Sequence, residues 1–137
     1  MSKIRYRFDD RTLMINNEVC AIITGFDKYA VSMSGNVYNI KTKRKLKPAY
    51  YSTNYNTYKR CRINLRNNGK NYNKYVHQLV AQEWLKETDL NPDDTPIVGK
   101  KCINHIDHDT TNNNVVNLEY CDYSYNNKHK DMILWKI

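Results

Sequence analysis

Residues 104–120 read NHIDHDTTNNNVVNLEY, and this stretch decides the fold that we expect for the chain. It places a histidine, carboxylates and several amides in a loop between two short apolar runs, Cys102-Ile103 and the run from Val116 to Tyr120. Short apolar runs bounded by turn-forming residues are typical of strands. Asp122 then offers an N-cap for a helix over about 123–132. The sequence therefore predicts a strand–loop–strand–helix unit.

Within that unit, one histidine and a few asparagines carry the useful chemistry. His105 is expected at the end of the first strand, and Asn126 one turn into the helix, facing the loop. Hydrolysis of a phosphodiester needs a base that deprotonates water near neutral pH, which a neutral histidine can do. It also needs a cation that stabilises charge on the leaving 3′ oxygen. Asn104 and Asn126 offer carbonyl oxygens for a hard cation, Mg²⁺ or Mn²⁺. We expect Asn117 to hydrogen-bond across the loop and fix the His105 ring.

The chain before this unit is expected to be mainly β-structure. Polar and apolar residues alternate on both sides of Ser34-Gly35, which is typical of a hairpin. The alternation over 58–65 predicts a strand that buries one face and shows a basic face to solvent. An amphipathic helix from Val76 to Leu85 follows. The other strands expected before it are 4–8, 13–15, 29–32 and 36–40.

The charge of the chain, a formal +8, favours a polyanionic partner. A sheet with a basic face could lie along a DNA groove and would give an affinity that falls steeply with salt. The run of basic residues over 41–47 is also compatible with a solvated turn. His77, on the expected helix, is open between helix packing and contact with a phosphate. The residues that we assign to DNA contact are Arg44, Lys45, Arg60, Arg62, Arg66, Lys70, Lys74 and His77.

The cysteines argue against a zinc knuckle, because none of them stands in a C-x-x-C pair. The chain also shows no secretory signal and no apolar run near ~18 residues, so we expect neither secretion by that route nor a membrane span. Reduced cysteines inside a cell are the simplest interpretation. The cysteines are Cys20, Cys61, Cys102 and Cys121.

Taken together, these segments resemble the HNH endonucleases of phages and introns. The family pattern is roughly (D/N)-H-x-D-G-x-x-x-N-N…N-L-x-W-x-T…N-x-x-H, and here it is matched over 104–129. Val76 to Ala81 reads VHQLVA, similar to the V-H-R-L-V-A helix of the family, and residues 25–38 resemble the small β module that often precedes it. The resemblance covers about 19–132 and implies a phage- or virus-encoded protein acting in the cytoplasm of a host cell.

Residue by residue, the resemblance implies His105 as general base, Asn104 and Asn126 as metal ligands, and Asn117 as the residue that orients the base. It implies that His129 contacts the scissile phosphate or completes the metal shell. Four positions depart from what is usual in the family, and Tyr120 and Cys20 are the two that replace tryptophans. Asn104 stands where many relatives have aspartate, which predicts weak metal affinity without DNA, and His108 replaces the usual glycine.

We therefore predict an α+β fold, with an N-terminal antiparallel β module for DNA contact (1–75) and a ββα-metal HNH unit (76–137). The expected reaction is metal-dependent hydrolysis of double-stranded DNA, leaving 5′-phosphate and 3′-hydroxyl ends. One site cuts one strand, so a monomer would nick, and a double-strand break would require a homodimer. The alternatives are a catalytically silent DNA-binding module of the same fold and a nuclease of low specificity that acts on DNA or RNA.

Overall fold

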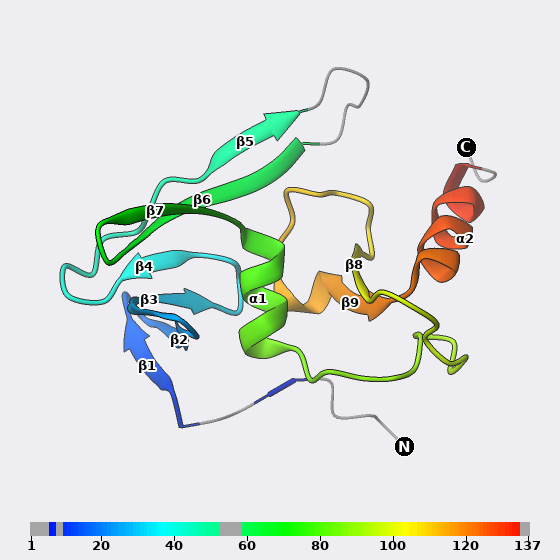
Figure 1. The fold of residues 1–137 in the computed structure, drawn as a ribbon, viewed down its shortest axis with the longest axis horizontal. Helices are drawn as coiled ribbons and strands as arrows, with labels where there is room; N and C mark the ends of the chain where they lie inside the picture. Colours follow the sequence, from blue (N-terminus) through cyan, green and yellow to red (C-terminus); the bar gives the residue numbers. More distant parts are fainter. Residues whose placement is uncertain (1–5, 8–9, 53–58, 135–137) are drawn as a thin grey trace.

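The computed structural model describes residues 6–7, 10–52 and 59–134, apart from the side chains of 51–52, 59 and 129–134. Within these residues, small antiparallel sheets surround one central helix, and a second helix follows the last strand (Figure 1). The strand expected over 4–8 lies mostly outside the described residues, although Tyr6 forms an isolated bridge with Leu85. No helix in the described part has the length and apolar character needed to cross a membrane.

The first sheet is a meander in which neighbours in sequence pair with each other, in the order β1-β2-β3-β4. The expected hairpin around Ser34-Gly35 is confirmed, because Tyr29 to Val31 pairs with Val37 to Asn39. Its strands are β1 (Thr12–Ile15), β2 (Glu18–Ile23), β3 (Phe26–Ser32) and β4 (Val37–Asn39).

The second sheet, in the order β5-β6-β7, carries the basic strand. Cys61, Ile63 and Leu65 are buried while Arg60 and Asn64 are exposed, so the expected alternation is confirmed. A tight turn at Asn68-Gly69, with both residues at positive φ, joins β6 to β7. The strands are β5 (Ala49–Ser52), β6 (Lys59–Asn67) and β7 (Lys70–Tyr75).

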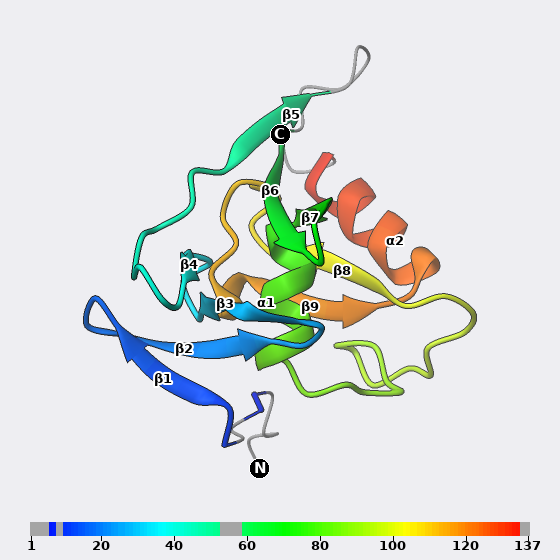
Figure 2. The same ribbon diagram turned by 60° about the vertical axis from the view of Figure 1, so that its left-hand side comes forward.

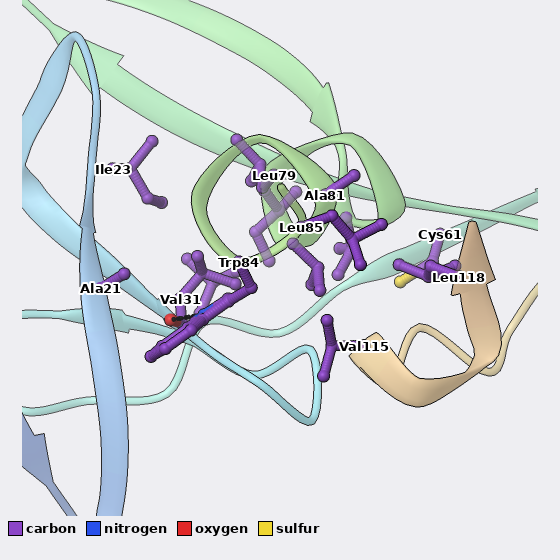
Figure 3. Close-up of a cluster of buried hydrophobic side chains, with 14 of the residues drawn as sticks. Ala21, Ile23, Val31, Cys61, Leu79, Ala81, Trp84, Leu85, Val115 and Leu118 are labelled. Carbon is purple, nitrogen blue, oxygen red and sulfur yellow. Dashed lines mark hydrogen bonds between the residues drawn. The ribbon is translucent and has the colours of Figure 1, made fainter. Parts of the chain in front are cut away.

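Helix α1 (Val76–Trp84) lies at the centre of the molecule and contacts all the sheets. Its apolar stripe is buried as the spacing predicts, and the indole Nε1 of Trp84 donates a hydrogen bond of 3.0 Å to the carbonyl oxygen of Val31 (Figure 3). The buried residues of the helix are Val76, Leu79, Val80, Ala81, Glu83 and Trp84.

One hydrophobic core spans the predicted boundary between residues 75 and 76. Around α1 it includes Ile23 and Val31 from the first sheet, Cys61 from the second, and Leu118 from the C-terminal hairpin (Figure 3). The division of the chain into 1–75 and 76–137 stays a prediction, and the core gives no sign of a break at that point.

The expected strand–loop–strand–helix unit follows as β8 (Cys102–His105), β9 (Leu118–Cys121) and α2 (Tyr123–Leu134). Val116 lies in a short 3₁₀ turn (Val115–Asn117) instead of the strand. The cause is local: the Asn114 side chain accepts a hydrogen bond of 3.1 Å from the Val116 backbone N–H, which turns the chain before β9 begins. Helix α2 packs against β8 (Figure 2).

Candidate active site

The β8–β9 hairpin fixes where His105 stands. The strands pair antiparallel with Cys102 opposite Cys121, Asn104 opposite Glu119 and His105 opposite Leu118. The backbone N–H of Ile106 donates to the carbonyl of Asn117 at 2.8 Å, which closes the loop between the strands. His105 is therefore the last residue of β8, at the mouth of the loop.

The imidazole of His105 is held by Asn113. Nε2 lies 2.8 Å from Oδ1 of Asn113, and only 9% of His105 and 6% of Asn113 are exposed. With the amide in this orientation Oδ1 accepts, so the ring proton is on Nε2 and the lone pair is on Nδ1. This hydrogen bond therefore selects the Nε2–H tautomer of His105 and leaves Nδ1 as the nitrogen that can accept a proton.

Asn117 does not make the contact with the ring that we expected from it. Its amide instead braces the loop: Nδ2 donates to Asp107 Oδ1 at 2.8 Å and to the Asn112 carbonyl at 2.9 Å, and Oδ1 accepts from the Asp107 backbone N–H at 3.0 Å. Asp107, two residues beyond His105, is the nearer partner for an amide on this side of the loop. Asn117 thus acts on the loop, and the ring is held by Asn113, for which no role is predicted from the sequence.

Asp107 is the anionic centre of that bracing. Besides Asn117 it accepts hydrogen bonds from the Asp109 backbone N–H at 2.8 Å and from Asn112 Nδ2 at 2.9 Å. Partial burial acts to raise the pKa of Asp107, but the bonds from Asn112, Asp109 and Asn117 outweigh it and hold the pKa below its ordinary value. An ionised carboxylate with these donors stiffens the loop beside the imidazole.

His108 stands at the position where the family pattern has glycine, and its backbone explains that preference. Its φ is +65°, in the left-handed region that side chains with a Cβ enter at a cost of about 1 kcal/mol. The loop therefore keeps the glycine conformation and carries an imidazole in its place.

The two predicted metal ligands lie on neighbouring elements. Asn104, on β8, is 5% exposed and its Nδ2 donates to Glu119 Oε1 at 2.9 Å. Asn126 lies in the first turn of α2, half-buried, with its backbone N–H bonded to the Asp122 carbonyl at 3.1 Å. Amide oxygens with a carboxylate adjacent are donors that Mg²⁺ and Mn²⁺ accept, so the residues fit such an ion. In the described part, no three His, Cys, Asp or Glu side chains converge to hold a metal by themselves.

A buried network sets the start of α2. Asp122 caps the helix, accepting from the Tyr125 backbone N–H at 2.8 Å, as expected. Asn91 binds it twice, with Nδ2 donating to Asp122 Oδ2 at 3.1 Å and Oδ1 accepting from the Asp122 backbone N–H at 2.9 Å. The loop before β8 therefore fixes the turn of α2 that carries Asn126. The sequence of 86–99 predicts a loop, and no pattern in it marks Asn91 as a partner of Asp122.

His77 packs directly against the catalytic candidate. Its ring lies edge-on to the ring of His105 with centroids 5.2 Å apart, and it stacks on Tyr75 at 5.6 Å. The guanidinium of Arg60 in turn lies 5.7 Å from the centre of the Tyr75 ring. Burial, followed by the nearby His105 and Arg60, lowers the pKa of His77 to about 4, so His77 is neutral at physiological pH. A continuous row of rings thus leads from the basic strand to the imidazole of His105.

The structure separates the basic residues that we assigned to DNA contact. Side chains alternate along β6, and Arg60, Arg62 and Arg66 project from the face opposite the buried Ile63. Lys74 pairs with Ile63 in the register and so belongs to the other face, where its Nζ lies 5.6 Å from the centre of the Phe26 ring. Lys70, at the start of β7, shares that parity with Lys74. Arg44 and Lys45 are exposed in the segment between β4 and β5.

The side chain of His129 lies outside the described residues, although its backbone belongs to α2. Its predicted role therefore stays a prediction. Within the described residues, the contacts above form two groups at the hairpin. His105 contacts Asn113 and His77, and Asn104 contacts Glu119.

Comparisons with known proteins find HNH endonucleases. No family model matches the chain. Two uncharacterized HNH endonucleases of Acanthamoeba polyphaga mimivirus are similar to it, and one of them is 32% identical over 108 residues, which are 79% of this chain and 24% of the length of that relative. The other is 29% identical over 103 residues, 75% of this chain and 27% of its own length. This chain therefore spans about a quarter of the length of these relatives.

Among solved structures, the HNH homing endonuclease I-HmuI, described for its DNA binding and cleavage, matches with a TM-score of 0.61 and 25% identity. The match covers 86% of this chain and 60% of that chain. The α+β architecture, the hairpin that presents His105 and these likenesses agree, and the chain belongs to the HNH endonuclease family.

Proposed function

We propose that this protein is a metal-dependent endonuclease that hydrolyses phosphodiester bonds in double-stranded DNA. The observation that carries the proposal is the buried imidazole of His105, whose Nε2 is bound to Asn113 at 2.8 Å. An imidazole fixed in this way presents Nδ1 as the atom that accepts a proton, next to an amide on the same strand.

In the proposed mechanism, Nδ1 of His105 takes a proton from the water that attacks the phosphorus. Asn104 and Asn126 would hold the divalent cation, with His129 completing the set or contacting the phosphate. When bound, the cation supplies positive charge to the leaving 3′ oxygen. The products are then 5′-phosphate and 3′-hydroxyl ends.

Both proposed protein ligands are neutral, since asparagine stands at 104. Metal affinity follows the number of anionic ligands, so the free protein should hold the ion weakly and the phosphate of DNA should complete the site. Mg²⁺ is the expected ion, because it favours few protein ligands together with phosphate oxygens, and Mn²⁺ should substitute for it.

For DNA contact we propose the outer face of β6, with Arg60, Arg62 and Arg66, extended toward the active site by Tyr75 and His77. The support is the row of contacts that joins Arg60 to His105 through these rings. Lys70, Lys74, Arg44 and Lys45 remain proposed phosphate contacts, and the register of β7 argues for Lys70 and Lys74 acting from the opposite face.

One such site cuts one strand at a time, so a monomer should nick and a homodimer would be needed for paired cuts. Because the curated relatives come from a giant virus, we infer a virus-encoded protein that acts on DNA within an infected cell. A homing role remains part of the proposal, supported by the likeness to I-HmuI.

The test is cleavage of supercoiled plasmid, linear duplex and structured RNA, each with Mg²⁺ and with EDTA. We expect nicking of DNA with Mg²⁺ only, and none by His105→Ala, which should still bind DNA. Binding without any cleavage would favour the silent DNA-binding module, and equal cutting of RNA the nuclease of low specificity. Undiminished cleavage by His105→Ala would remove His105 as the base.

A further inference from the structure

The turn between β3 and β4, residues 33–36, lies directly against the loop that carries Asn113. A Cβ built on Gly35 would stand 3.1 Å from the Cβ of Asn113 and 3.1 Å from its carbonyl oxygen. Next to this contact, the backbone N–H of Val115 donates to the carbonyl of Met33 at 2.8 Å. The N-terminal sheet therefore contacts the residue that holds the catalytic imidazole.

This turn is itself rigidly held. The Glu18 carboxylate of β2 accepts hydrogen bonds from the Ser34 hydroxyl, from Asn36 Nδ2 at 3.0 Å and from the Tyr38 hydroxyl at 2.5 Å. The Ser32 hydroxyl accepts from the Asn36 backbone N–H at 3.0 Å. These hydrogen bonds resist displacement of the turn when it is in close contact with Asn113.

Asn113 borders a cavity on the side of the contact. This cavity, of about 140 Å³, is lined by Asn113 and Thr111 of the loop and by Ser34, Gly35 and Asn36 of the turn. A methyl group added at Gly35 would therefore displace Asn113 by a few tenths of an ångström, since the contact is tight and the turn is held by its hydrogen bonds. Any such shift acts on the bond of 2.8 Å to His105.

We propose that the β3–β4 turn is the support of Asn113, so that the N-terminal sheet positions the catalytic imidazole as well as contacting DNA. Gly35 is a positioning residue: the absence of a side chain lets the turn approach Asn113 closely enough to fix it. Glu18 acts in the same direction by holding the turn. This inference rests on the proposed function of His105 as general base.

The chain offers a matched control for the test. Gly35 has a φ of +89°, so Gly35→Ala carries backbone strain as well as the added methyl group. Gly25 and Gly69 have φ values of +84° and +77° with nothing within 4 Å of an added Cβ. Gly25→Ala and Gly69→Ala therefore reproduce the strain without touching the active site.

The first readout is the tautomer of His105, from its ring ¹⁵N chemical shifts at one fixed pH in the protein without metal. Wild type, Gly25→Ala and Gly69→Ala should show the proton on Nε2, and Gly35→Ala should show a mixture of both tautomers. The second readout is single-turnover cleavage of DNA with Mg²⁺. We expect Gly35→Ala to be about five-fold slower than the controls, with DNA affinity unchanged, because small misplacements of a catalytic group cost rate.

Glu18→Gln is the second variant, since it keeps the size of the side chain and weakens the bonds to the turn from a distance. It should shift the tautomer and the rate in the same direction as Gly35→Ala. The inference is overturned if Gly35→Ala matches the two control variants in both readouts. A wild-type protein that does not cut would contradict the proposed function, and the tautomer comparison would still decide the role of the turn.

Discussion

Asn113 accepts a buried hydrogen bond of 2.8 Å from Nε2 of His105 and so determines which nitrogen of that ring is basic. Asn113→Leu keeps the branched shape and the number of heavy atoms of the side chain and removes the acceptor. Removing a residue that orients a functional side chain by a hydrogen bond commonly lowers activity about 10- to 100-fold. Cleavage should therefore slow by roughly that factor while DNA binding persists. Single-turnover cleavage measured alongside gel-shift affinity checks this, and a wild-type rate in the variant would show that the amide has no part in orienting the ring.

Glu119 lies where it can supply the negative charge that Asn104 lacks. Its Oε1 accepts from Asn104 Nδ2 at 2.9 Å, which holds the amide in place. Glu119→Gln should weaken Mn²⁺ binding about 10-fold, measured by calorimetry or by the electron spin resonance of free Mn²⁺. Asp27→Asn, which removes an exposed carboxylate paired with Arg11 on the first sheet, is the control and should leave affinity unchanged.

Exchanging the amide at position 104 with the carboxylate at position 119 tests the role of Glu119 in Mn²⁺ binding further. In the double variant Asn104→Asp with Glu119→Gln, one carboxylate and one amide remain opposite each other in the hairpin. Mn²⁺ affinity should recover to the wild-type level or above it, since the charge now belongs to the ligand itself. Equal loss in the single and double variants would mean that charge at this pair does not govern metal binding.

His77 makes stability depend on pH. Its folded pKa of about 4 lies below the ordinary value of 6.5, so the unfolded chain binds the proton more readily between those values. Stability should therefore be complete above pH 6.5 and be lost as the pH falls toward 4, by at most about 3 kcal/mol. Urea unfolding at pH 7 and pH 4.5 measures the loss. His77→Gln should show a smaller difference between the two pH values, and an identical difference would assign the loss to other groups.

Arg60 is the test of the basic face. It is exposed on β6, and its guanidinium lies over Tyr75 at the start of the row of rings. Arg60→Gln should lower DNA affinity and reduce the slope of log K against log salt by about 0.9, as expected for one lost phosphate contact. Arg11→Gln, at the distant edge of the first sheet and paired with Asp27, should leave the slope unchanged. Equal slopes for both variants would place the DNA elsewhere.

Much of the β8–β9 hairpin and of the helix after it could be predicted because their signals are local. The N-cap at Asp122, the apolar runs of β8 and β9 and the stripe on α1 each lie within a few residues of the structure that they specify. Local signals also gave the buried and exposed faces of β6, since alternation is a property of one strand.

The contacts that the sequence did not reveal are those between distant segments or between equivalent candidates. Asn112, Asn113 and Asn114 are chemically the same, and only the path of the loop decides that Asn113 meets the imidazole. The face on which Lys74 lies depends on how β7 pairs with β6, which its weakly alternating sequence leaves open. The approach of Gly35 to Asn113 joins residues far apart in the chain, and no spacing rule covers it.

The position of Trp84 bears on how such a hairpin can be inherited. Its indole is bound to Val31, and its helix shares one interior with both upstream sheets. Grafted alone into another protein, residues 76–134 would expose this helix to water on the sides that those sheets now cover. A recombination event that transfers the hairpin as a folded unit must therefore carry the upstream strands with it.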